Sequence, residues 1–285
     1  MPSDRPQRMR VGELVAVGRT SDVYEFGSGA VVKVPRPDVP DHWAPLEAAY
    51  AQAVGALDVP APSVIDVTQV DGRNAIVFER IEGRSMWAHM CDAPEQVESL
   101  AELLAATHRR IFEAGPPDGL DGMRDRSRRK IAEADRLSAG ERSEAAQLLD
   151  ELPVGAALLH GDLHPGNVLM TRDGPVPIDW FDASIGHPVS DILRSSLLLR
   201  GSGRVEPPHL PGADVPTLQR VHDTYLAAMS DFLSPVAELL PRWEAVKAVS
   251  RLSEGGHPDE DELLRIWVDR DADTAEGARR WNRFR

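Results

Sequence analysis

Short apolar runs separated by turn residues fill the first eighty positions of the chain. Strand-like runs lie at 11–17, 22–26, 30–34, 63–69 and 74–79. Runs of β-branched residues bounded by Gly, Ser and Asp are typical of antiparallel strands, and Asp71-Gly72 predicts a tight hairpin between the last two. A helical stretch at 42–57 separates the third strand from the fourth. We therefore expect a five-stranded antiparallel sheet with one helix.

The pattern changes to a helical period after residue 82, where Leu100, Leu104, His108 and Ile111 recur on one face. Charged helices are expected over 118–150, and their basic cluster at 124–130 is interpreted as a solvated face. Short strands are expected at 156–159, 168–170 and 176–178, and helices from 188 onward, broken at 201–216. The sequence thus predicts an α+β protein with a small lobe at 1–82 and a larger, mainly helical lobe at 83–285.

A polar loop lies between two apolar strands at 158–169. Within it Asp162 and Asn167 are five residues apart, and a second polar position, Asp179, follows the next short hairpin. Loops held between strands position side chains rigidly, so we expect these three residues to meet at one edge.

Transfer of a phosphoryl group requires such a group of side chains. The transition state spreads negative charge, and the protein mainly positions the reactants and neutralises charge with metal ions. We assign Asp162 as the carboxylate that meets the acceptor hydroxyl. Asn167 and Asp179 offer oxygen ligands suited to Mg²⁺.

His160-Gly-Asp162, Asn167 and Asp179-Trp-Phe together resemble the catalytic loop and metal-binding motif of the aminoglycoside phosphotransferase and choline kinase family. The resemblance implies a protein-kinase-like fold of two lobes, the smaller one binding ATP or GTP. It also implies that Asp191 is a buried brace for the catalytic loop. His160 is interpreted as a core residue that shapes the same loop.

The same resemblance assigns nucleotide-binding residues in the small lobe. Val31-Val-Lys33-Val34 is similar to the family's third strand, so Lys33 is expected to contact the phosphates, oriented by Glu47 on the following helix. The turn at 18–24 lacks a glycine-rich phosphate motif, and Ser21 is its candidate phosphate contact. Residues 77–81 resemble the hinge between the lobes, with Glu79 and Ile81 beside the base.

The chain carries a net charge of −14, which argues against a nucleic-acid partner and allows a cationic ligand. Only three of its 32 basic residues are Lys, namely Lys33, Lys130 and Lys247. The chain has no run of about 20 apolar residues, the length needed to cross a bilayer. Cys91 is alone and forms no internal disulfide. We expect a cytoplasmic protein with no membrane or protein partner.

The acceptor is predicted to be a small hydroxylated molecule, above all an aminoglycoside-type antibiotic held between 118–150 and the helices after 201. Acidic residues of 254–276 and around Asp223 or Asp231 are candidates to bind a polycation. Trp243, Trp267 and Tyr225 either line the pocket or pack between helices. Choline, homoserine, a sugar or a macrolide is the alternative acceptor.

Two other classes of protein stay open. His160, Asp162, His164 and Asp179 are ligand types that also suit a transition metal in a hydrolase, although such an enzyme has no use for Lys33 and Glu47. A nucleotide-binding pseudokinase is the other alternative. The complete set of Lys33, Asp162, Asn167 and Asp179 argues against it.

Overall fold

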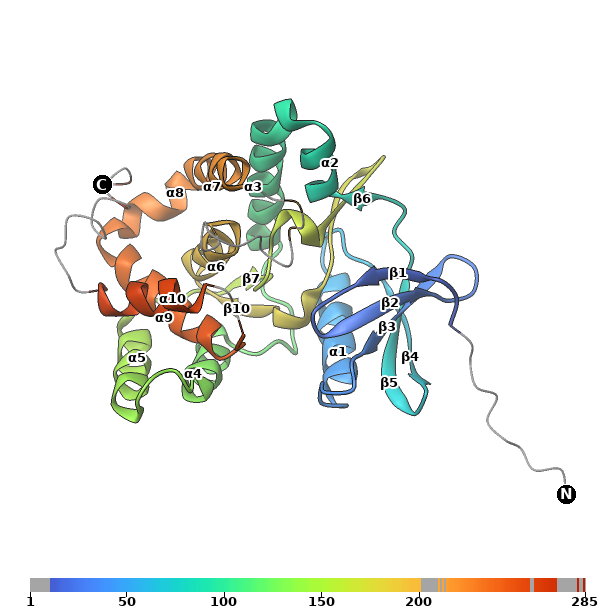
Figure 1. The fold of residues 1–285 in the computed structure, drawn as a ribbon, viewed down its shortest axis with the longest axis horizontal. Coiled ribbons are helices and arrows are strands. Elements are labelled where there is room, and N and C mark those ends of the chain that lie inside the picture. The colour runs from blue at the N-terminus through green and yellow to red at the C-terminus, as the bar shows by residue number, and fades with distance from the viewer. Residues whose placement is uncertain are drawn as a thin grey trace, which may run out of the picture.

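Five antiparallel strands of order β1-β2-β3-β5-β4 form the sheet at the N-terminal end (Figure 1). The computed structural model describes residues 11–200, 210, 212, 214–256, 259–270, 281 and 284. The strands are β1 (Leu14–Val17), β2 (Ser21–Glu25), β3 (Ala30–Pro35), β4 (Val64–Val70) and β5 (Arg73–Glu79). All five predicted strands are present, although the first begins three residues later than the sequence pattern indicates.

The hairpin between β4 and β5 confirms the prediction from Asp71-Gly72. Asp71 has φ of 49° and Gly72 has φ of 81°, so both central residues are left-handed. A two-residue turn of this kind matches the twist of the flanking strands and favours Asp followed by Gly. The turn fixes the register in which Gln69 pairs with Asn74.

Helix α1 (Trp43–Gly55) packs against the sheet with small side chains. Ala44 and Ala48 contact Ile76 of β5 in a buried cluster, and Val54 joins the main core of the molecule. Alanine at these positions lets the helix approach the strands closely, because it presents no bulky side chain. The approach matters for function, since Glu47 lies on the same buried face.

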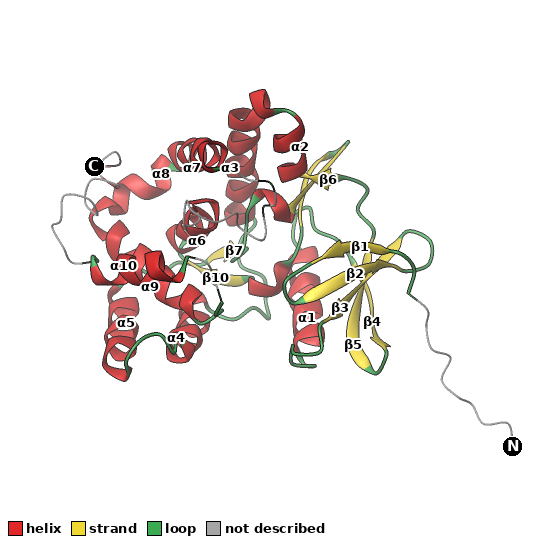
Figure 2. Cartoon of the chain, viewed as in Figure 1, coloured by secondary structure: helices red, strands yellow, loops and turns green. Residues whose placement is uncertain are grey.

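The larger part of the chain is mainly helical (Figure 2). Its helices are α2 (Met86–Asp92), α3 (Val97–Glu113), α4 (Met123–Glu133), α5 (Ala139–Glu151), α6 (Pro188–Arg200), α7 (Val215–Ala228), α8 (Ser230–Leu233), α9 (Leu240–Leu252) and α10 (Glu260–Val268). Helix α6 lies at the centre, with eleven of its residues buried. No helix among the described residues has the length and apolarity to span a bilayer.

Short strands frame the loops between these helices. β7 (Ala157–Leu159) pairs with β10 (Ser184–Gly186), and β8 (Val168–Thr171) pairs with β6 (Arg84–Ser85) and β9 (Gly174–Pro177). One-turn 3₁₀ helices, η2 (Pro165–Asn167) and η3 (Trp180–Asp182), follow β7 and β9 along the chain. The polar loops are therefore held at both ends by paired backbone.

The fold class predicted from the sequence is confirmed, with two corrections to its detail. The helix α2 and the short strands β6 and β10 have too few residues to give a periodic signal. The basic cluster at 124–130 is not wholly a solvated face, because Arg126 and Lys130 sit four residues apart on the inner side of α4, next to buried Ser127 and Ile131. The boundary between the lobes, predicted between residues 82 and 83, falls between β5 and β6 in the structure and stays a prediction. Residues 201–209, 211 and 213, part of the expected break at 201–216, lie outside the described residues.

Candidate active site

Lys33 joins three separate parts of the chain. Its Nζ lies 2.6 Å from Glu47 Oε1 on α1 and 2.9 Å from Asp179 Oδ1, which follows β9. Lys33 is positioned by β3, where it pairs with Val23 on one side and Ile76 on the other. The structure thus brings together Lys33 and Glu47, as expected, and adds Asp179 to them.

Burial and charge oppose each other in this group. Burial alone lowers the pKa of Lys33, but the carboxylates of Asp179 and Glu47 outweigh it and hold the pKa above its ordinary value. Burial raises the pKa of Glu47 to about 7, although the ammonium of Lys33 opposes that rise. Lys33 is therefore a fixed positive charge, as a residue that steadies phosphate oxygens needs to be.

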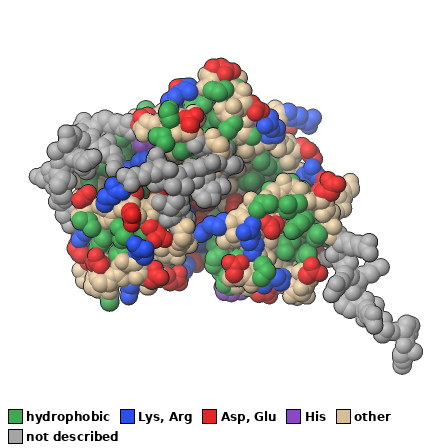
Figure 3. Space-filling view, viewed as in Figure 1, with side chains coloured by type: hydrophobic (Ala, Val, Ile, Leu, Met, Phe, Trp, Pro, Cys, Tyr) green, Lys and Arg blue, Asp and Glu red, His purple; other side chains and the backbone are tan. Residues whose placement is uncertain are grey.

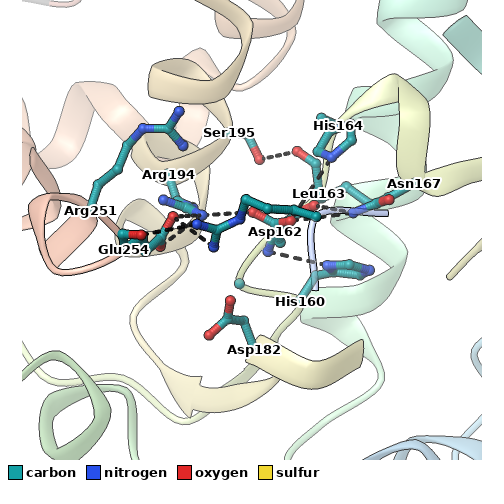
Figure 4. A network of polar contacts seen from close by, with 12 residues as sticks. His160, Asp162, Leu163, His164, Asn167, Asp182, Arg194, Ser195, Arg251 and Glu254 are labelled. Atoms are coloured by element: carbon teal, nitrogen blue, oxygen red, sulfur yellow. Dashed lines mark hydrogen bonds and ion pairs between the residues drawn. The ribbon is translucent and has the colours of Figure 1, made fainter. Parts of the chain in front are cut away.

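Asp162 lies in the loop after β7, and its carboxylate is held from both sides (Figure 4). Oδ1 accepts a hydrogen bond of 2.8 Å from Arg194 Nη2, and Asn167 Nδ2 lies 3.4 Å from Oδ2. Asn167 Nδ2 also donates to the backbone oxygen of Asp162 at 3.1 Å. The side chain keeps 26% exposure, which leaves it accessible to a substrate hydroxyl.

The loop that carries Asp162 is braced from α6. Asp191 Oδ2 accepts the backbone N–H of His160 at 2.6 Å, and its Oδ1 accepts that of Gly161 at 2.9 Å. His108 Nε2 contacts the same carboxylate at 2.9 Å, and His108 Nδ1 contacts the Tyr225 hydroxyl at 2.8 Å. Asp191 thus has the geometry expected of a buried brace.

Asp179 and Asn167 are the candidate metal ligands, and the donor set fits Mg²⁺. The backbone N–H of Ile178, which precedes Asp179, donates to Asn167 O at 2.9 Å. Asp179 and Asn167 therefore lie at neighbouring strand ends. Because Asn167 donates through Nδ2, its amide oxygen faces away from Asp162 (Figure 4). Asp179 has φ of 66°, a conformation uncommon outside Gly and Asn or Asp, and strain of this kind is concentrated at functional sites.

The transition-metal alternative fits this geometry poorly. His160 is fully buried, its Nε2 contacts the backbone oxygen of Ile178 at 3.0 Å, and its Nδ1 accepts the N–H of Asp162 at 3.3 Å. Both ring nitrogens are thus engaged by backbone, and burial lowers the pKa of His160. His164 Nδ1 accepts the N–H of Gly166 at 3.0 Å. Within the described ranges no group of three or more His, Cys, Asp or Glu is arranged to hold a metal.

The other nucleotide candidates lie in the small lobe. Ser21 is buried at the start of β2, and its backbone oxygen closes the preceding turn with the N–H of Gly18 at 2.8 Å. Glu79 ends β5. Its N–H donates to Ser63 O, and its carboxylate accepts a hydrogen bond from Ser63 Oγ. Ile81 follows directly. Among the described residues, no hydrogen bond or ion pair links Ser21, Glu79 or Ile81 to the group that Lys33 forms with Glu47 and Asp179.

Several charged residues lie near Asp162 in an arrangement that sequence reasoning did not predict. Glu254, just after α9, pairs with Arg194 at 3.0 Å, with Lys130 at 3.2 Å and, through its backbone oxygen, with Arg19 at 3.0 Å. Arg194 belongs to no motif, and Glu254 was a candidate only as part of the acidic segment 254–276. Glu254 is 92 residues from Asp162 in sequence, so no local pattern signals that they lie close together. The scarcity of Lys was a usable signal for Lys130.

The residues predicted to hold a cationic acceptor are mostly engaged elsewhere. Trp243, Trp267 and Tyr225 are buried to 1% exposure or less, which supports their interpretation as packing residues. Asp231 pairs with Arg109, and Asp223 accepts a hydrogen bond of 2.7 Å from Gln219. Residues 257–258 and 271–276 of the acidic segment lie outside the described residues.

Comparison with known proteins identifies the group to which this arrangement belongs. The model of the phosphotransferase enzyme family matches residues 11–251, which include the sheet, the loop of Asp162 and Asp179. The chain belongs to the phosphotransferase enzyme family. The match confirms the family predicted from the sequence.

Solved structures share the phosphotransferase fold at low sequence identity. Amicoumacin kinase hAmiN has a TM-score of 0.60 and 14% identity, with 95% of this chain and 90% of that chain covered. An aminoglycoside-3'-phosphotransferase of type VIII has a TM-score of 0.56 and 22% identity, covering 86% and 92%. A choline/ethanolamine kinase family protein from Mesorhizobium loti has a TM-score of 0.53 and 14% identity, covering 98% and 89%.

One curated relative also matches this phosphotransferase. It is the uncharacterized protein YcbJ of Bacillus subtilis (strain 168), 23% identical over 165 residues. The match covers 51% of this chain and 54% of that protein, so the chain spans about half the length of its curated relative.

Gly161 provides a test of the loop geometry. It has φ of 83°, and a Cβ there would lie 2.2 Å from the backbone oxygen of Asp182. Gly161→Ala is expected to destabilise the protein by about 2 kcal/mol or more, because left-handed backbone costs alanine about 1–2 kcal/mol before the steric clash is added. Urea denaturation measures the change. Gly55→Ala, at a site with no atom within 4 Å, is the control and is expected to be neutral or stabilising.

Asp191 provides a pH-dependent test. Burial raises its pKa, but His108 and its hydrogen bonds outweigh this and hold the pKa of Asp191 below its usual 3.8. A depressed carboxylate pKa stabilises the fold above the unfolded value and loses that effect as the pH falls through the folded value. Asp191→Asn should therefore cost about 1–3 kcal/mol at pH 7. The difference from the wild type should shrink below pH 3.8 in urea titrations.

The matched control for that titration is Asp173→Asn, since Asp173 lies on the exposed β8–β9 turn with 81% of its side chain accessible. Its substitution should leave stability unchanged at every pH. If both variants lost the same free energy of unfolding, Asp191 would not brace the loop.

Proposed function

We propose that this protein transfers the γ-phosphoryl group of ATP, or of GTP, to a hydroxyl of a small molecule, with Asp162 as the catalytic carboxylate. The observation that carries the proposal is the bridge from Lys33 to Glu47 and Asp179 at 2.6 and 2.9 Å. It joins a strand, a helix and a loop residue 146 positions away in sequence, which is the arrangement a phosphate-binding Lys requires. Among the fold relatives, hAmiN was solved with AMP-PNP and Ca²⁺.

The transfer is a direct displacement. Asp162 orients the acceptor hydroxyl and receives its proton as the hydroxyl oxygen bonds to the γ-phosphorus. The bond from that phosphorus to the β–γ bridging oxygen breaks, and the nucleoside diphosphate leaves with the electron pair. Lys33 steadies the donor phosphates, and Arg194 and Asn167 fix the direction of the Asp162 carboxylate. Mg²⁺ held by Asn167 and Asp179 would neutralise charge on the phosphates when bound.

The family assignment does not specify the acceptor, so the acceptor class is a separate part of the proposal. An aminoglycoside-type antibiotic, and with it a role in resistance, is supported by fold relatives that are aminoglycoside phosphotransferases. A metabolic alcohol is supported equally by the choline/ethanolamine kinase relative. On the face in Figure 3, acidic and basic side chains are interspersed, so the charge of −14 is not gathered there into one acidic patch.

Substitution of Asp162 tests the proposal directly. Asp162→Ala should lower turnover by about 10²–10⁴-fold, the usual contribution of a positioned acid or base, with nucleotide affinity nearly unchanged. Asp179→Ala should in addition lose metal-dependent nucleotide binding. The measurements are nucleotide consumption and calorimetric nucleotide titration with Mg²⁺, using ATP and GTP and a panel of hydroxylated acceptors.

Asp173→Ala is the matched control, because this exposed carboxylate sits on the hairpin between Asn167 and Asp179 and contacts Arg172. Its turnover should equal that of the wild type. Near-full transfer by Asp162→Ala would refute the catalytic assignment. Nucleotide binding without turnover on any acceptor would favour the pseudokinase.

A further inference from the structure

A cavity of about 30 Å³ lies directly behind the loop of Asp162, and basic side chains line it. It begins at Gly161 and extends between α4, α6 and α9. The basic residues are Arg126, Lys130, Arg194, Lys247 and Arg251. Two of the three Lys residues of the whole chain thus face one cavity, in a protein whose other cations are almost all Arg.

The acids of the cavity already have partners. Asp182 pairs with Arg126 at 3.1 Å and Lys130 at 3.0 Å. Glu254 pairs with Arg194 and Lys130. Asp191, the third acid in the lining, accepts two backbone N–H groups and contacts a histidine. No acid in the lining is left to serve a further cation.

Lys247 is the cation left over. Across the ranges that the structure describes, its ammonium has no hydrogen bond and no ion pair, although the residue is half-buried on α9. Burial, and then the positive charges of Lys130 and Arg194, lower the pKa of Lys247 to about 8, although Asp191 and Asp182 oppose the shift. An anion that entered the cavity would stabilise this ammonium, because a partly buried charge without a partner is unfavourable.

Two neighbours of Lys247 in the lining also have unused hydrogen-bonding capacity. Ser190 is fully buried, and its Oγ has no partner within the described part of the chain. Arg251 is 5% exposed and lies 3.3 Å from Asp259 through Nε, in a geometry that makes no hydrogen bond. Figure 4 shows its guanidinium beside Arg194, with no dashed line to the other residues drawn. Buried donors without partners are rare in folded proteins and call for a ligand or water.

We propose that this cavity is an acceptor subsite, in which Lys247, Arg251 and Ser190 bind an oxyanion group of the hydroxylated substrate. The group is a carboxylate or a phosphate. The inference rests on the proposed kinase function and narrows it, because the substrate then carries negative charge close to its reacting hydroxyl. A polycationic acceptor would bring its charge against Lys247.

Size and position agree with this assignment. A cavity needs roughly 10–15 Å³ to hold one water, so about 30 Å³ accommodates the oxygens of a small oxyanion. Arg194 lines the cavity and also donates to Asp162, so an anion bound there lies one side chain from the catalytic carboxylate. The positive lining also lowers the energy of a negatively charged ligand next to the triphosphate.

The direct test titrates malonate into the full chain. Calorimetry measures its affinity, and thermal unfolding measures the stability of each variant. Wild type should bind malonate, and Lys247→Met should bind it at least about tenfold more weakly, whereas Lys247→Arg should restore part of the affinity. Lys247→Met should unfold at the same temperature as the wild type or higher, because it removes an unpaired ammonium. A merely structural Lys247 would give the opposite shift.

Two further variants and the pH sharpen this test. Ser190→Ala should also weaken malonate, while Lys33→Met should not, since Lys33 belongs to the nucleotide site. Binding should weaken as the pH rises through about 8, as Lys247 loses its proton in the field of Lys130, Arg194, Asp191 and Asp182. Equal malonate affinity in wild type and Lys247→Met, or no binding by the wild type, would mean that the cavity holds water only and would overturn the proposal.

Matched acceptor pairs then test the substrate class with ATP and Mg²⁺. The pairs are gluconate with glucose, glycerate with glycerol and glucose 6-phosphate with glucose, alongside kanamycin and choline. Turnover confined to an acid or a phosphate supports the subsite and tells which oxyanion it takes; turnover confined to a neutral or cationic acceptor contradicts it. Malonate binding in a protein that binds no nucleotide would instead refute the kinase and leave the anion site standing.

Discussion

The buried carboxylate of Asp191 accepts the first two backbone N–H groups of the loop that carries Asp162. Those donors lie away from water, and leaving them unpaired would cost about 1–3 kcal/mol each, so the loop is fixed where the carboxylate is. The same helix supplies two more contacts one turn on: Arg194 donates to Asp162, and Ser195 donates to Leu163 O at 2.7 Å. Residues 191, 194 and 195 share one face of α6, because they are three and four positions apart. A single central helix therefore sets the position of the loop and the direction of its carboxylate.

Charge extends this control to the nucleotide side. Glu254 contacts Arg19 in the turn before β2 and also pairs with Arg194, which in turn holds Asp162. The turn predicted to contact the nucleotide phosphates is thus linked to the proposed catalytic carboxylate by three consecutive polar contacts. Lys33 forms the second link, from β3 to Asp179. If the nucleotide binds as proposed, its charge would act on both links, so donor binding would be coupled to the orientation of Asp162.

The sequence predicted what local patterns encode. Local patterns predicted the strands, the hairpin at Asp71-Gly72 and the proximity of Asp162 and Asn167. The structure contains the hairpin and a hydrogen bond between Asp162 and Asn167. The sequence did not predict Arg194, or that Glu254 pairs with Arg194, because these contacts form only when α6 and α9 pack beside the loop. The cluster at 124–130 failed for a related reason: a run of charges has a solvated face only on one side of a helix, and the position of the core decides which side Lys130 takes. Which residues meet at a site is a property of packing, and local composition carries little of it.

The use of Lys follows from the same packing. An Arg carries a wide planar fork that suits a bidentate carboxylate, and Arg109, Arg128 and Arg220 bind carboxylates in that way. A compact ammonium can stand close to a single oxyanion, and its charge responds to its surroundings, which a guanidinium charge does not. Lys33 lies between two carboxylates beside the proposed nucleotide site, whereas Lys130 and Lys247 face the cavity behind Asp162. Lys occurs at these three positions alone, and they fall at the two places where we propose that negative charge is bound, one on the donor side of Asp162 and one on the acceptor side.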